Sequence, residues 1–435
     1  MALLANQARS YATAIHQVAR DVFKSGNPAD RVVNAYFRDI KKLGSRDRRM
    51  IAETLFSLFR WWGWLRQLLE DSQSLWDDGG ERSEEWARLL YAAHLLDNAE
   101  LHPVAQEWQQ TANLPHISHG MGALTLAEKS RRLRELFRAT PFDAAALVPG
   151  WLQQCVPLDE QAYLSFLAYL QQRPPLWLRA QVEREALILE LRSAGLVPTL
   201  TAMLPQALCL EQARVNLFEL QSFRDGKFEL QDFASQMIGI ATQAKPGERW
   251  WDACAGAGGK TLQLAAMMQN KGTLIASDIR EYKLLELRKR ARRAQFSNIS
   301  PRPWNEAKLP VKHGSVDGVL VDAPCTGTGT WRRNPDCRWT AKAEDVAEMA
   351  QLQLDILSRA SKAAKPGGVV VYATCSVCEA ENEAVVRAFL AQRQEFTLEG
   401  WQNPLTGTLT DGMLRVWPMD ANCDATFAAR FRRNM

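Results

Sequence analysis

The chain has 435 residues, of which 46% are hydrophobic and 23% are charged. This composition is typical of a globular protein, and the length predicts two or three domains. The net charge of +4 neither requires nor excludes a nucleic-acid partner, because a basic face can coexist with a mild average. No window of 18 uninterrupted apolar residues predicts a transmembrane helix, and residues 1–21 lack the apolar core of a signal peptide.

The eight cysteines are too few for the disulfide framework of a small secreted domain. We therefore expect a cytoplasmic protein with reduced cysteines that are buried, catalytic or metal-bound. Nothing in the sequence indicates a membrane partner or an obligate oligomer, so a monomer is expected.

Residues 1–140 are expected to form an all-helical domain. The run from Ile51 to Leu69 carries apolar residues at helical spacing, and its tryptophans are expected to pack in a core. Gly44 and Ser45 precede this run and predict a helix start with Ser45 as the N-cap. Residues 141–230 are expected to contain linker helices and a small α/β module with RNA-recognition-motif-like architecture.

From residue 231 to 435 short buried-type strands alternate with helical stretches. The strand candidates are WWDACAG, TLIASDI, VDGVLVDAP and GGVVVYATCS. This alternation predicts a doubly wound, mostly parallel, Rossmann-like sheet. In such sheets ligands bind outside the carboxyl ends of the strands, which is where the motifs below fall.

A glycine-rich turn, DACAGAGGKT, occupies residues 252–261 between a strand and a helix. It is compatible with a Walker A loop, a dinucleotide fingerprint, a turn that holds S-adenosylmethionine, or a strand–helix turn without a ligand. Cys254 stands where Walker A needs its first glycine, and Thr261 stands where the dinucleotide fingerprint needs its last. Asp278 lies 20 residues after Gly258, where a carboxylate can accept hydrogen bonds from ribose hydroxyls, and argues against a phosphate loop.

Two cysteines, Cys325 and Cys375, each follow a hydrophobic strand candidate. If the two strands are neighbours, about 4.8 Å apart, both thiols can face one flipped base. Methylation of cytosine at carbon 5 needs a thiolate that adds to carbon 6, a proton acceptor and a group that polarises the ring.

Other interpretations of these cysteines are inert packing, a redox pair or a zinc site. Cys375 and Cys378 form a single CxxC, whereas a structural zinc site needs four ligands. The histidine pair of suitable spacing, His116 and His119, falls in a different predicted domain. No metal is therefore expected.

At these residues the chain resembles the Nop/Sun family of RNA 5-methylcytosine methyltransferases, in particular bacterial members that modify small-subunit ribosomal RNA. Residues 322–329, DAPCTGTG, are similar to the family's DAPCSGxG signature, and residues 373–376 are similar to its TCS signature. Residues 44–48 of the helical region resemble the NusB-like RNA-binding domain of some relatives. The turn reads AGAGGK where CAAPGGK is usual.

The resemblance implies a role for each matching residue. Cys375 corresponds to the nucleophile, Cys325 to the second cysteine that assists proton removal or product release, and Asp322 to an acid close to both cofactor and base. The implied cofactor is S-adenosyl-L-methionine, and the residues implied to bind it are Cys254, Ala255, Gly256, Ala257, Gly258, Gly259, Lys260, Asp278, Asn305 and Asp322.

RNA is the expected partner, with ribosomal RNA favoured over transfer RNA. Arg332 and Arg333 follow Cys325 and, with Arg179, are candidate RNA contacts. A basic run over residues 283–293 could bind phosphates or form a solvated helix face. A non-catalytic RNA assembly factor and a P-loop nucleotidase remain competing functions.

Overall fold

The computed structural model describes residues 2–69, 74–76, 83–211, 215–304 and 308–435. The chain forms two compact units. The first consists of Met1–Gln154, Leu158–Arg173 and Trp331–Lys342, and the second of Cys155–Pro157, Pro174–Thr330 and Ala343–Met435. No helix in the described ranges is long and apolar enough to cross a membrane.

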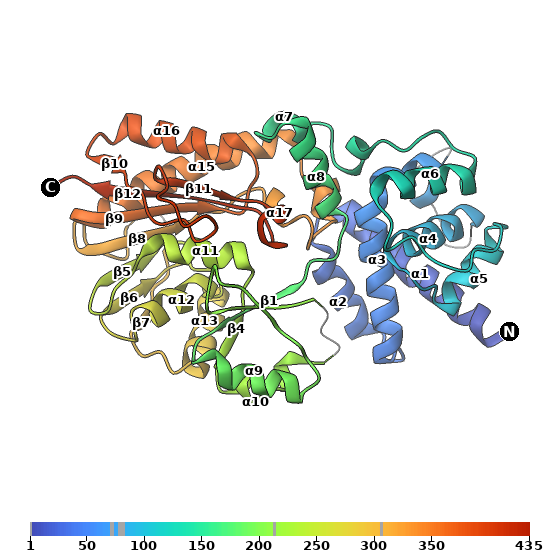
Figure 1. Ribbon diagram of the computed structural model, residues 1–435, viewed down its shortest axis with the longest axis horizontal. Coiled ribbons are helices and arrows are strands. Elements are labelled where there is room, and N and C mark those ends of the chain that lie inside the picture. Colours follow the sequence, from blue (N-terminus) through green and yellow to red (C-terminus); the bar gives the residue numbers. More distant parts are fainter. Residues whose placement is uncertain (1, 70–73, 77–82, 212–214, 305–307) are drawn as a thin grey trace. The chain divides into compact units, whose positions relative to one another are not determined.

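The first unit is helical, as the sequence predicts for residues 1–140 (Figure 1). Its longer helices are α1 (Ala2–Ser25), α2 (Ala29–Asp39), α3 (Ser45–Leu65), α4 (Glu84–Asp97), α5 (Pro103–Thr111), α6 (Leu126–Phe137) and α8 (Glu160–Leu170). The expectation that Ser45 is an N-cap is wrong by one residue. Helix α3 begins at Ser45 with Gly44 as its cap, and the Asp47 carboxylate accepts the Gly44 N–H at 2.8 Å.

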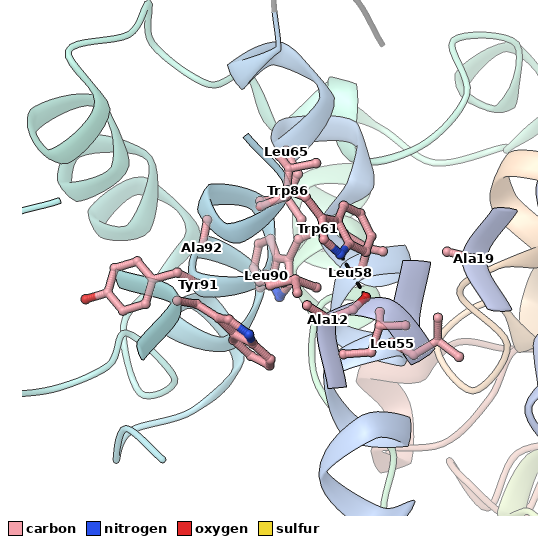
Figure 2. Close-up of a cluster of buried hydrophobic side chains, with 14 of the residues drawn as sticks. Ala12, Ala19, Leu55, Leu58, Trp61, Leu65, Trp86, Leu90, Tyr91 and Ala92 are labelled. Carbon is pink, nitrogen blue, oxygen red and sulfur yellow. Dashed lines mark hydrogen bonds between the residues drawn. The ribbon is translucent and has the colours of Figure 1, made fainter. Parts of the chain in front are cut away.

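The apolar stripe of α3 lies in the core of this unit. Leu55, Leu58 and Trp61 are fully buried and pack with residues of α1 and α4, as Figure 2 shows. The indole of Trp86 on α4 donates a hydrogen bond to the carbonyl of Ala12 on α1 at 2.9 Å, which satisfies the polar atom of a buried tryptophan. The prediction that these tryptophans serve core packing is confirmed.

Residues 331–342 join the helical unit although they follow Cys325 in the chain. Arg338 is fully buried, and burial lowers its pKa to about 9. Its guanidinium donates to the carbonyls of Arg60, Leu147, Leu170 and Trp331. The short helix α14 (Cys337–Thr340) that carries Arg338 is thus bound to the helices by charge-assisted hydrogen bonds.

A small antiparallel sheet opens the second unit, in the order β2-β3-β1-β4. Its strands are β1 (Leu176–Ala180), β2 (Thr199–Leu200), β3 (Ala207–Leu210) and β4 (Phe228–Leu230). Helices α9 (Arg184–Ser193) and α10 (Gln221–Arg224) pack against it. This agrees with the expected small α/β module, while the boundaries proposed for three domains stay a prediction.

The large sheet has the order β10-β12-β9-β8-β5-β6-β7, with β11 paired to β12. Strands β5 to β9 pair in parallel, and β12 is antiparallel to its neighbours β9, β10 and β11. The strands are β5 (Arg249–Asp252), β6 (Thr273–Ala276), β7 (Ile299–Pro301), β8 (Val316–Asp322), β9 (Ala364–Thr374), β10 (Phe396–Leu398), β11 (Met413–Val416) and β12 (Thr426–Arg433). The doubly wound, mostly parallel sheet is confirmed.

Alternate strand residues face opposite layers of helices, because side chains alternate along a strand. Trp251, Ile275 and Val319 belong to a core with residues of α15 and α16, whereas their neighbours Trp250 and Leu274 pack with residues of α11 and α12. The ribbon shows α15 and α16 on one side of the sheet and α11 and α12 on the other (Figure 1). The helices are α11 (Phe233–Thr242), α12 (Gly259–Met267), α13 (Glu281–Arg293), α15 (Ala343–Ala360) and α16 (Glu383–Gln392).

The strand order reverses between β5 and β8. From β5 the chain proceeds outward to β6 and β7, then returns to the other side of β5 with β8 and β9. Parallel sheets bind ligands in the crevice at this switch point. The glycine-rich turn follows β5, and the Cys325 loop follows β8, so both lie at the switch.

Replacing Gly63 by alanine should destabilise the first unit, although alanine is favoured by about 1 kcal/mol within helices. A Cβ at Gly63 would overlap the carbonyl of Ala146 and lie 2.9 Å from the Trp339 ring. We expect Gly63→Ala to lower the unfolding free energy by about 3 kcal/mol, measured by denaturation followed with tryptophan fluorescence. Gly150→Ala is the control, because its Cβ would meet no atom within 4 Å. A variant Gly63→Ala as stable as Gly150→Ala would contradict this packing.

Candidate active site

The glycine-rich turn places open backbone at the end of β5. Gly256 has φ +52° and Gly258 has φ +91°, a left-handed conformation that favours glycine. A Cβ on Gly256 or on Gly259 would meet no atom within 4 Å. The backbone of the turn is therefore accessible to a ligand at these positions, and α12 begins there without a side-chain cap hydrogen bond from Gly258.

Asp278 lies just beyond β6 and faces this turn. Its carboxylate accepts four hydrogen bonds, one from the Gly256 N–H and three from the backbone and guanidinium of Arg280, at 2.8–3.1 Å. Burial opposes ionisation, but the Arg280 and Gly256 hydrogen bonds prevail and lower the pKa of Asp278. The Asp278 side chain is 4% exposed and that of Arg280 is 52% exposed, so the guanidinium is the partner that can leave.

A cavity of about 730 Å³ adjoins both features, which is within the usual size range of small-molecule sites. Ile279 and Trp304 give it apolar walls, and the Trp304 indole N–H is buried without a hydrogen-bond partner among the described residues. The predicted residues that line it are Cys254, Ala255, Gly256, Ala257, Asp278, Asp322, Cys325 and Cys375. An acid for hydroxyls, open glycine backbone and apolar walls fit a nucleoside-containing cofactor.

Lys260 and Asp322 form an ion pair in this region. Lys260 Nζ lies 2.8 Å from Asp322 Oδ2, with the two side chains 15% and 30% exposed. Burial alone would lower the pKa of Lys260, but the Asp322 carboxylate raises it. Because Lys260 is committed to Asp322, it does not extend freely as a Walker A lysine would toward a triphosphate.

The two predicted cysteines lie side by side. Strands β8 and β9 are parallel neighbours with Asp322 opposite Ala373, so the loops that follow them leave the same edge of the sheet. The Sγ atoms of Cys325 and Cys375 are 3.3 Å apart, and both residues line the cavity. The expectation that their strands are neighbours is confirmed.

Two cysteines that line the cavity, Cys325 and Cys254, have raised pKa values. The hydrogen bond with Cys375, burial and the nearby Glu381 charge raise the pKa of Cys325 well above its ordinary value. Burial and the carboxylates of Asp252 and Asp322 likewise raise the pKa of Cys254. Cys325 and Cys254 are therefore protonated at neutral pH, and neither is a ready nucleophile.

Two of the three predicted RNA contacts are buried. Arg179 is 3% exposed and donates to Gln231 Oε1 at 2.6 Å, and Arg332 is 1% exposed and donates to the carbonyls of Gln172 and Arg173. These two guanidiniums serve protein-internal hydrogen bonds, so the expectation that they meet RNA phosphates is corrected. Arg333 is half-buried and stays a prediction. Asn305 lies outside the described residues.

The basic run of α13 is partly structural. Arg290 and Arg293 both bind the carboxylate of Glu229, whose side chain is 2% exposed, on β4 of the small sheet. Two cations of this run therefore hold the small sheet against α13. The sequence alone could not distinguish this structural role from phosphate binding.

Some residues of the site carry no recognisable sequence signal. Arg280, which covers Asp278, and Glu381, which binds both cysteine loops, occur in stretches that match no pattern considered above. In the part of the chain that the structure describes, no group of three or more His, Cys, Asp or Glu side chains could hold a metal ion.

Comparison with known proteins gives consistent similarities. Residues 240–432 match the family described as 16S rRNA methyltransferase RsmB/F. The chain is 32% identical over 303 residues to a probable ribosomal RNA small subunit methyltransferase B of Synechocystis sp., covering 66% of each chain. It is 32% identical over 278 residues to ribosomal RNA small subunit methyltransferase B of Vibrio cholerae, covering 60% of this chain and 62% of the relative. The match thus spans just under two thirds of these relatives.

The fold is shared with a solved crystal structure named PH0851. The TM-score is 0.75 at 23% sequence identity, and the superposition covers 97% of this chain and 99% of the other. The profile match over the large sheet, the similarity to the two relatives and the paired cysteine motifs agree with one another. Residues 240–432 of the chain therefore belong to the RsmB/F methyltransferase family.

Proposed function

We propose that this protein methylates carbon 5 of a cytosine in ribosomal RNA through a covalent bond between Cys375 and the pyrimidine ring. The observation that carries the proposal is the 3.3 Å approach of the Cys325 and Cys375 sulfurs at the wall of the cavity. Two thiols at one reacting centre suit a reaction that needs both a nucleophile and a proton carrier.

S-adenosylmethionine is the methyl donor of this family, and when bound it supplies an electrophilic methyl group on a positively charged sulfur. Gly256 and Gly259 leave backbone open for it, and Asp278 can accept hydrogen bonds from its ribose hydroxyls once Arg280 withdraws. Ile279 and Trp304 provide apolar surface for an adenine ring. These backbone and side-chain groups can hold S-adenosylmethionine without a metal ion.

Cys375 attacks as a thiolate. The new bond between its sulfur and carbon 6 makes carbon 5 electron-rich, so that carbon 5 can take the methyl group. Removal of the proton from carbon 5 then restores the double bond and expels the thiolate. Asp322 is suited to accept a hydrogen bond from the exocyclic amino group of cytosine, and Lys260 holds Asp322 in place.

The pairing of the thiols explains a change of role for Cys325. The hydrogen bond with Cys375, burial and repulsion by the Cys375 charge raise the pKa of Cys325. Once Cys375 is bonded to carbon, this repulsion ends and Cys325 gives up its proton more readily. Cys325 then becomes competent to assist removal of the carbon 5 proton, a task for which it is unsuited before the attack.

The two cysteine variants should differ in kind. Cys375→Ala is expected to lower methyl transfer by at least about 10³-fold and to form no protein–RNA adduct, because the nucleophile is missing. Cys325→Ala is expected to trap an adduct that survives denaturing gel electrophoresis, because resolution of the intermediate is slowed. Cys209→Ala, at a buried cysteine of the small sheet, is the control. Equal and mild effects of both active-site changes would argue against the covalent mechanism.

Arg280 should compete with the cofactor for Asp278. Arg280→Ala is expected to tighten S-adenosylmethionine binding by up to about 5-fold, since a half-exposed ion pair contributes about 1 kcal/mol or less. Asp278→Ala is expected to weaken binding, because the ribose loses its acceptor. Isothermal titration calorimetry measures both. Weaker binding by Arg280→Ala would mean that Arg280 contacts the cofactor itself.

Bisulfite sequencing tests the substrate. Total RNA from cells that carry Cys375→Ala in place of the wild-type chain should lack one 5-methylcytosine of small-subunit ribosomal RNA that wild-type cells contain. Loss of a methylcytosine from transfer RNA instead would preserve the chemistry but replace the substrate. An unchanged methylcytosine profile would contradict the proposed function.

A further inference from the structure

We propose that Glu381 is a positioning residue of this site, whose buried carboxylate ties the Cys325 loop to the Cys375 loop and places a negative charge beside them. The inference rests on the proposed function for its kinetic consequence only. Glu381 is fully buried, in the short helical turn Glu379–Glu381 that follows β9. A buried carboxylate is costly unless its charge is met by hydrogen bonds.

Four neutral donors, from three residues, form hydrogen bonds to the Glu381 carboxylate. Thr326, next to Cys325, donates its N–H to Oε1 at 2.9 Å and its hydroxyl to Oε2 at 2.6 Å. Ser376, next to Cys375, donates its hydroxyl to Oε2, and Gln353 of α15 donates to Oε1 at 2.9 Å. Four donors occupy the lone-pair sites of an ionised carboxylate. Each residue that follows a site cysteine is therefore held by the same side chain.

A second layer fixes this arrangement. Gln353 also donates to the carbonyl of Pro324, immediately before Cys325, at 2.9 Å, and it accepts the Tyr372 hydroxyl at 3.0 Å. The Gly329 N–H donates to the carbonyl of Cys375 at 2.8 Å. The two loops thus meet through backbone as well as through Glu381, and a shift of one would displace the other sulfur.

The Glu381 charge acts on its ionisable neighbours. The hydrogen bond with Cys375 and burial are the main causes that raise the pKa of Cys325, and Glu381 adds to them. Burial raises the pKa of Cys155, Cys378 and Tyr372, and the same carboxylate adds to each rise. Glu381 therefore favours a protonated Cys325 before attack.

The charge is tested by alkylation, which needs no methyltransferase activity. In a Cys375→Ser background, Glu381→Gln should raise the rate at which iodoacetamide modifies Cys325 at pH 8.5 by about 3- to 10-fold, because loss of the nearby negative charge lowers the pKa of Cys325 and increases its thiolate fraction. Peptide mass spectrometry follows Cys325 specifically. Glu379→Gln is the matched control, since that carboxylate is half-exposed and pairs with Arg387. Alkylation within two-fold of the background protein overturns this part.

Positioning is tested in the protein that retains Cys375. Glu381→Gln is expected to lower kcat by between about 10- and 100-fold with KM for S-adenosylmethionine unchanged, because reacting groups are misplaced while the cofactor cavity is not. Thr326→Val and Ser376→Ala keep the Glu381 charge and each remove one hydrogen bond to its carboxylate, so they should lower kcat without faster alkylation of Cys325. If Glu381→Gln does not fold, these two variants decide the matter, and wild-type kcat in both overturns the proposal. A wild-type protein that alkylates as expected but does not methylate RNA contradicts only the proposed function.

Discussion

The parallel pairing of β8 with β9 is the constraint on which the site depends. Side by side, the two strands end at one edge of the sheet, and their registers bring Asp322 opposite Ala373. Because β8 also pairs with β5 on its other side, the glycine-rich turn and the thiols line the same cavity. A change of register by one residue would reverse the faces of the side chains and separate the two sulfurs.

The charges in and beside the cavity depend on which groups lie next to each carboxyl group. Asp322 is paired with Lys260, and Asp278 is paired with Arg280, whose hydrogen bonds help to lower the pKa of Asp278. Asp252, at the end of β5, accepts a hydrogen bond from the Thr261 hydroxyl, but burial outweighs this bond and the Lys260 charge and raises the pKa of Asp252 to about 7. The pKa values of Asp278 and Asp252 thus shift in opposite directions because of their burial and their immediate partners.

Much of this arrangement could be predicted from the sequence. Buried strands that end in cysteines, and a glycine turn followed by Asp278, have local patterns, and these patterns gave the sheet type and the paired thiols correctly. Arginine roles had no such pattern. Arg179, Arg332 and Arg290 resemble surface cations in the sequence, yet their partners lie 52, 160 and 61 positions away in the chain. Contacts between residues so far apart in the chain depend on tertiary structure, so no short stretch of the sequence reveals them.

The helical unit is completed by a segment from late in the chain. Residues 174–330 intervene before Trp331–Lys342 can deliver Arg338 to the carbonyls that receive it. At about 5–20 residues per second, a ribosome takes roughly ten to thirty seconds to make that stretch. During this interval the backbone carbonyls of Arg60 and Leu170 lack their Arg338 donor, because residues 331–342 have not yet been synthesised. If the gene were divided into an N-terminal and a C-terminal half, neither product could form these hydrogen bonds. The N-terminal product would keep the acceptor carbonyls without Arg338, and the C-terminal product would carry Arg338 without its acceptors.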